Sequence, residues 1–168
     1  LYTGGMPRRT LTPRPTFRDE AFVLRTYRLG EADLIVVLLT REHGQVRGVA
    51  KGIRKSKSRF GAKLDRFTRV NVQIYPGRNL ANITDADALE SYAGPIVADP
   101  DRYFAGCAAL EVAQLFGGED ESVFSLLDAT LRDLAALEPL LPLVNIVDRF
   151  VLHCLNLAGW APSLVHCA

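Results

Sequence analysis

The sequence lacks the features that mark membrane proteins and disulfide-stabilised proteins. Its longest uninterrupted apolar run covers only residues 34–39, whereas a membrane-spanning helix needs roughly 20 apolar residues. The three cysteines are an odd and widely spaced set, which indicates reduced thiols rather than a disulfide framework. The sequence therefore predicts a cytoplasmic protein without a membrane partner.

The common signatures of catalysis are also missing. The sequence contains no phosphate-binding glycine loop, no nucleophile elbow and no H-E-x-x-H motif. Asp85 and Asp87 share one face of an expected strand and His43 lies in an expected turn, and both arrangements are typical of structural or solvent-facing side chains. We expect a protein that is not an enzyme.

What the sequence does have is an uneven distribution of charge. Residues 1–84 hold 17 Lys and Arg against 6 Asp and Glu, whereas residues 85–168 hold 3 against 13. This asymmetry favours a basic module for a polyanion and an acidic module for a different partner. Mutual attraction between the two halves is the alternative explanation.

The basic charge is concentrated in residues 46–69, which carry nine cations and the single anion Asp65. Apolar residues are interspersed among these cations, so we expect part of the segment to fold while its charges stay in solvent. A merely solvated surface is the alternative, although ordinary surfaces mix charges of both signs. The candidate phosphate-binding residues are Arg47, Lys51, Arg54, Lys55, Lys57, Arg59, Lys63, Arg66 and Arg69.

Residues 17–93 predict a small β-domain. Short β-rich runs separated by turn residues give expected strands at 20–28, 33–40, 45–52, 67–75 and 80–92, with a short helical turn at 61–65. The run at 33–40 is continuously apolar, which indicates a strand covered on both faces. Five such strands predict a closed barrel of the oligonucleotide-binding (OB) type, which leaves no open sheet edge.

Side-chain alternation divides the barrel residues between its two faces. On the strand at 45–52, Arg47 and Lys51 are expected to point outward while the small Gly48 and Ala50 face a crowded interior. Tyr27 and Tyr75 are expected on outward faces, where they are candidates for stacking on nucleic-acid bases. The alternative is that both tyrosines are partly buried strand residues.

Residues 94–168 predict three helices that form a bundle beside the barrel. Asp99 and Pro100 have the character of an N-cap and a first helical residue, which opens a helix that extends to Phe116. Further helices are expected at 119–137 and 140–158. The fold class is therefore α+β, preceded by a flexible arm at 1–16 in which Met6 is the expected natural start and residues 1–5 a cloning remnant.

No complete metal site is expected in this chain. His153 and Cys154 are adjacent in an expected helix, where neighbouring side chains point about 100° apart, and His166 and Cys167 lie at the end of the sequence. Four ligands are needed for a structural zinc site, and these residues are not expected to supply them together.

Several short motifs, in this order along the chain, resemble the RecO family of bacterial DNA-repair and recombination mediators. They are LGEAD at 29–33, TREHG at 40–44, VAKG at 49–52, RKSKSR at 54–59, GRNL at 77–80 and GWAP at 159–162. The resemblance extends from Phe17 to Cys167.

The resemblance implies a non-enzymatic, nucleoid-associated cytoplasmic protein with an N-terminal OB-fold and a helical domain. Such a protein binds single- and double-stranded DNA, anneals complementary strands and, with RecR, helps to load RecA onto strands coated by single-stranded-DNA-binding protein. In this family, the helical domain contacts the single-stranded-DNA-binding protein. By similarity, the family's DNA-contacting region corresponds to Lys51, Arg54, Lys55, Lys57 and Arg59.

The resemblance also implies a zinc module in many full-length members. It consists of four cysteines and follows the position of Cys167, which would be the first ligand, so zinc is expected for the full-length protein and not for this chain.

Two other functions stay open at the level of the sequence. One is a protein-interaction scaffold whose basic segment docks on an acidic partner. The other is an RNA-binding OB-fold module, which would share the same electrostatics and prefer ribose strands.

Overall fold

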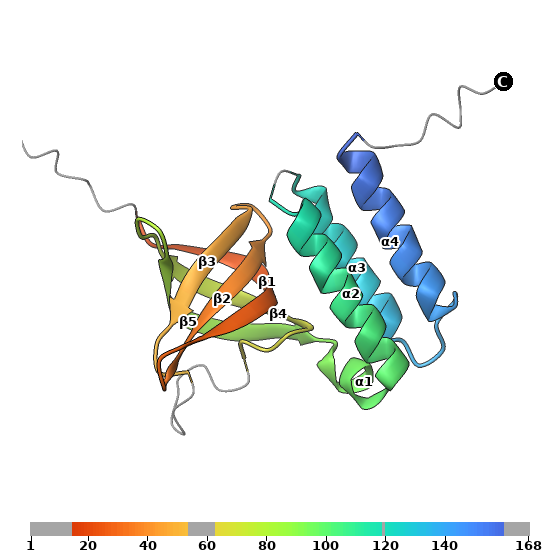
Figure 1. The fold of residues 1–168 in the computed structure, drawn as a ribbon, viewed down its shortest axis with the longest axis horizontal. Coiled ribbons are helices and arrows are strands. Elements are labelled where there is room, and N and C mark those ends of the chain that lie inside the picture. The colour runs from red at the N-terminus through yellow and green to blue at the C-terminus, as the bar shows by residue number, and fades with distance from the viewer. Residues whose placement is uncertain (1–14, 54–62, 119, 160–168) are drawn as a thin grey trace, which may run out of the picture.

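The computed structural model describes residues 15–53, 63–118 and 120–159 (Figure 1). Five strands are followed by four helices. The strands are β1 (Phe17–Leu29), β2 (Asp33–Thr40), β3 (Gln45–Ala50), β4 (Thr68–Tyr75) and β5 (Ala81–Ser91), and the helices are α1 (Ala93–Ala98), α2 (Pro100–Phe116), α3 (Ser122–Ala135) and α4 (Leu143–Leu157).

The strands form a closed barrel in the order β1-β2-β3-β5-β4. All neighbouring pairs are antiparallel except β3 and β5, which run parallel and are joined only through the pairs Gly48–Ala81 and Val49–Asn82. This closure confirms the predicted five-stranded barrel of the OB type followed by helices.

Alternate residues of the strands fill the barrel interior. Val70, Val72 and Ile74 of β4 are fully buried there, as their spacing predicts. Gly48 faces the same interior, and a Cβ at this position would lie 2.7 Å from Cδ1 of Ile83. The barrel therefore has room for no side chain at this point of β3.

A second core joins the barrel to the helices. Val37 and Leu39, on the outer face of β2, pack with Phe22 of β1 against residues of α2 and α3. The rings of Phe22 and Phe124 of α3 have centroids 5.2 Å apart. Strand β2 is therefore covered on both faces, as its continuous apolar sequence predicts.

Strand β1 differs from its predicted half-buried pattern. Its residues 21–24 are buried on both faces, whereas residues 25–29 are exposed. The change follows a register shift between Val23 and Arg25 in the pairing with β2. The helices cover only the first part of β1, which leaves the second part open to solvent.

Helix α2 begins as predicted, and helix α1 is an addition to the prediction. The side chain of Asp99 accepts a hydrogen bond of 3.0 Å from the backbone N–H of Asp101, and Pro100 is the first helical residue. Gly94 and Pro95 both lie in α1, because proline is tolerated in the first helical turn. Ile96 of α1 is completely buried in the second core.

A close helix–barrel contact is made by Gly106 of α2, and it gives a stability prediction. A Cβ on Gly106 would lie 2.7 Å from Cε1 of Phe67, so Gly106→Ala should lower the free energy of unfolding by about 1–3 kcal/mol in spite of the higher helix propensity of alanine. Gly94 has no heavy atom within 4 Å of such a Cβ, and Gly94→Ala should instead be neutral or stabilising. Urea denaturation of both variants checks this difference in sign.

Candidate nucleic-acid interface

The outward surface of β1, β2 and β3 gathers cations from strands that are distant in sequence. Val37 of β2 is paired with Arg25 on one side and with Arg47 on the other. Residues that pair directly in an antiparallel sheet share a face, so both arginines lie on the outside of the barrel. We call this surface the β1–β3 face and define it by Arg25, Tyr27, Arg47 and Lys51.

Tyr27 lies between the two arginines of this face. Its ring centroid is 5.0 Å from the guanidinium carbon of Arg25 and 6.0 Å from that of Arg47. The residue is 36% exposed, as expected for an outward position. The two guanidinium groups favour a fixed ring orientation through cation–π attraction, and the ring stays accessible to a planar partner.

The cations of the β1–β3 face are not neutralised by the described part of the protein. Arg25, Arg47 and Lys51 are exposed, and none of them forms an ion pair with a carboxylate of residues 15–53, 63–118 or 120–159. Three cations and an accessible aromatic ring on an OB barrel match the usual requirements for binding a nucleic-acid strand.

A groove at the barrel–helix junction extends this surface toward Arg66. Arg25 of β1 and Arg66 line the groove together with Cys107 and Glu111 of α2, and its volume is about 320 Å³. The guanidinium of Arg66 donates a hydrogen bond of 2.9 Å to the hydroxyl of Tyr103. Arg66 therefore adds positive charge beside the β1–β3 face, although Glu111 lies in the same groove.

Two of the predicted cations have carboxylate partners instead. Lys63 lies 3.5 Å from Asp87 of β5. Arg69 lies 3.1 Å from Glu20 and 3.8 Å from Asp128, and its side chain is mostly buried. Their placement gives no support to a role in binding phosphate, because partners within the protein already compensate both charges.

The other predicted residues are distributed as follows. Tyr75 is exposed at the end of β4, and no guanidinium of the described residues lies over its ring. Arg54, Lys55, Lys57 and Arg59 fall outside the described residues. The cations of 46–69 that the structure describes thus divide between the β1–β3 face, the groove and internal ion pairs.

Arg25 was not among the predicted site residues. It lies about twenty positions before the basic segment, so the charge density of residues 46–69 does not indicate it. The two-residue period of β1 places it on the same face as Tyr27. That period was the signal in the sequence that could have identified it.

The barrel surface around β5 has the opposite character. The guanidinium of Arg18 donates to Asp85 over 2.7 Å and holds the pKa of that carboxyl below its usual value. Asp87 lies 3.8 Å from the same arginine. These carboxylates are therefore engaged in ion pairs at the surface.

Tyr92, at the junction of barrel and helices, predicts a pH dependence of stability. Its hydroxyl donates a hydrogen bond of 2.8 Å to Asp128, and burial together with this bond raises its pKa. The folded protein disfavours the ionised phenol of Tyr92. The stabilisation that this hydroxyl provides is therefore complete below about pH 10, and it is lost as the pH rises through the raised pKa of Tyr92.

Tyr92→Phe should therefore lower the free energy of unfolding by about 1–3 kcal/mol at neutral pH. It should also weaken the loss of stability at alkaline pH. Urea denaturation across a pH series checks this, and an unchanged alkaline profile would contradict the assigned role of Tyr92.

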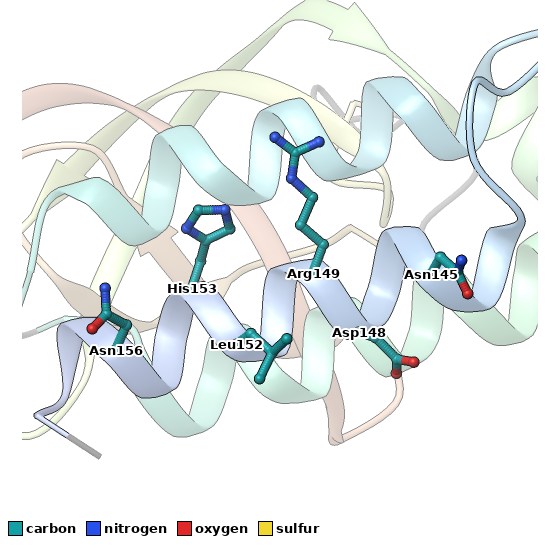
Figure 2. A pocket seen from close by; sticks show the side chains of 6 residues that line it. All are labelled: Asn145, Asp148, Arg149, Leu152, His153 and Asn156. Atoms are coloured by element: carbon teal, nitrogen blue, oxygen red, sulfur yellow. The ribbon is translucent and has the colours of Figure 1, made fainter. Parts of the chain in front are cut away.

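The outer side of α4 offers no comparable constellation. A hollow of about 440 Å³ is lined by residues that come from this helix alone. Figure 2 shows Arg149 and His153 projecting to one side of α4 and Asp148 to the other. Cys154, next to His153, is instead buried in the core, where desolvation raises its pKa to about 11. His153 and Cys154 are thus separated, as the helical geometry predicts.

Residues 15–53, 63–118 and 120–159 hold neither a metal-binding cluster nor a helix able to span a membrane. In this part of the chain no three His, Cys, Asp or Glu side chains are grouped in a way that could hold a metal ion. Cys167 and His166 lie outside it. None of the helices there has the length and apolar character needed to cross a membrane.

Comparison with known protein families identifies the chain. Residues 14–92 match the family model for the N-terminal part of recombination protein O, and residues 97–168 match the model for its C-terminal part. The first match contains the whole barrel, and the second begins within α1. The chain therefore belongs to the RecO family, whose role is in recombinational DNA repair.

Proposed function

We propose that the chain is a non-enzymatic recombination mediator that binds single- and double-stranded DNA across the β1–β3 face and anneals complementary strands. The cluster of Arg25, Tyr27 and Arg47 is the observation that carries this proposal. Phosphates of one strand contact the exposed guanidinium groups, and bases stack on the tyrosine ring at about 1–3 kcal/mol per base.

The position of the cluster on the barrel supports the same proposal. OB barrels bind oligonucleotides on the face of their second and third strands and on the adjoining loops. Arg47 and Lys51 lie on β3 and immediately after it. The segment 54–59, which holds four more cations, follows directly in the sequence.

We further propose that the chain acts with RecR to help load RecA onto single strands coated by single-stranded-DNA-binding protein. The membership in the RecO family supports this step. Binding of each purified partner to this chain, measured by calorimetry, tests the two interactions separately.

The function itself is tested with fluorescently labelled DNA and RNA strands of the same sequence. The chain should bind the DNA strand and accelerate annealing with its complement in the absence of any nucleotide cofactor. A clear preference for the RNA strand would favour an RNA-binding module. Failure to bind either strand would favour a scaffold that interacts only with proteins.

A further inference from the structure

A second feature of the barrel lies at the end where β1 and β3 begin. Because β5 pairs only with Gly48 and Val49 of β3, residues 45–47 of β3 have no strand partner on that side within the described part of the chain. This edge opens onto a hollow of about 550 Å³, which we call the barrel-mouth hollow. The start of β1 and the connection between β4 and β5 border the same hollow, and both lie at this end of the barrel in Figure 1.

One wall of the barrel-mouth hollow is a fixed aromatic pair. The rings of Phe17 and His43 are stacked with centroids 4.0 Å apart and an interplanar angle of 20°. Nδ1 of His43 lies 2.7 Å from a carboxylate oxygen of Asp19, which is buried. The same carboxylate accepts hydrogen bonds from the backbone N–H groups of Glu20 and Glu42. The orientation of the His43 ring is therefore set by a buried and well-anchored partner.

The remaining walls combine apolar surface with polar groups. Val46 and Ile74 contribute apolar side chains, and Asn79 contributes an amide that can donate and accept hydrogen bonds. No carboxylate occurs among the described residues that line the hollow. Its size and mixed lining are typical of a site for a small planar group.

Arg47 connects this hollow to the β1–β3 face. It lines the hollow, and its guanidinium carbon also lies 6.0 Å from the ring of Tyr27. A strand whose phosphate is held by Arg47 thus passes the entrance of the hollow. An anionic strand meets no opposing carboxylate on the described walls.

We propose that the barrel-mouth hollow receives one unpaired nucleobase of a strand bound on the β1–β3 face, stacked on the pair Phe17–His43. This inference rests on the proposed function and adds a defined base-binding site to it. A base held in this way cannot pair with a complementary strand, so single strands are favoured over duplexes at this position.

The test uses short single strands that carry the fluorescent base 2-aminopurine at one position at a time. Stacking on an aromatic side chain quenches this base, so one position should be quenched on binding to the full chain. His43→Gln removes the ring but keeps a side-chain donor for Asp19, and it should abolish that quenching. It should also weaken binding between about 5-fold and about 150-fold. The salt dependence of binding should not change, because no phosphate contact is removed.

Phe17→Leu provides a second variant, which removes the other ring and should give the same loss of quenching. Phe104→Ala is the control, because this exposed aromatic lies on α2 away from the barrel mouth. Normal binding with no quenched position, or quenching that survives in both variants, would overturn the base-binding site and leave the proposed function intact. Absence of any binding to the strands would instead contradict the proposed function.

Discussion

Replacing both Arg25 and Arg47 by glutamate should lower the affinity for single-stranded DNA by at least about 100-fold. A hydrogen bond to a charged group contributes about 1.5–3 kcal/mol, and the two arginines stand at the centre of the β1–β3 face. The substitution also places two like charges beside the phosphates. Fluorescence anisotropy with a labelled strand at a fixed salt concentration measures the loss.

The fold should tolerate these substitutions. Arg25 and Arg47 are exposed and have no carboxylate partner among the described residues, so no internal ion pair is broken. Arg149→Glu is the matched control, because Arg149 is an exposed arginine on α4, at the far side of the helices in Figure 1. The double variant changes the net charge by four units and the control by two, so a loss in the control that is half as large on a logarithmic scale would mean that binding follows only the overall charge.

Phe124→Ala should cause the largest loss of stability, about 3–5 kcal/mol in the free energy of unfolding. Phe124 is buried where α3 meets the barrel, and its ring packs against Phe22 of β1. The guanidinium carbon of Arg41 lies 4.6 Å from the centroid of the Phe124 ring. Truncation thus leaves a cavity at the junction and removes a cation–π contact.

Urea denaturation followed by far-ultraviolet circular dichroism checks this prediction. A domain of this size is stable by only about 5–15 kcal/mol, so the shift of the midpoint should be large. Phe104→Ala, in which a residue that is 74% exposed is truncated, should change the free energy of unfolding by no more than about 0.5 kcal/mol. Similar effects of the two variants would show that barrel and helices do not share a core.

Most of the fold could be predicted because periodicity reports burial directly. The run at 33–40 is apolar throughout, and the structure accordingly buries Val36 and Leu38 in the barrel and Val37 and Leu39 under the helices. Helix α1 could not be predicted from its own sequence, since Gly94 and Pro95 disfavour a helix in isolation. The burial of Ile96 in the second core supplies the stabilisation.

The candidate site was predictable only in part because it depends on pairing between distant segments. Alternation along β3 correctly placed Arg47 outward, but the proximity of Arg25 follows from the register of both residues with Val37. The ion pairs of Arg69 and Lys63 likewise join segments that are distant in sequence. Glu20 is 49 positions from Arg69 and Asp87 is 24 positions from Lys63, so charge density alone could not separate paired from available cations.

The fold also changes the interpretation of the uneven charge distribution along the chain. Asp85, Asp87 and Glu90 belong to β5 of the barrel rather than to the helices. The barrel therefore carries a basic β1–β3 face and an acidic surface near β5, where Arg18 and Lys63 pair with carboxylates. An uneven field of this kind favours one orientation for an approaching polyanion.

The salt dependence of binding tests the central claim, that phosphates lie across the β1–β3 face, most directly. Each phosphate contact on a single strand contributes about 0.7 to the slope of log K against log salt concentration. The variant with Arg25→Ala and Arg47→Ala should thus show a slope that is shallower by about 1.4, whereas Arg149→Ala should keep the original slope. If the double variant and the unmodified chain give the same slope, the strand does not lie on this face.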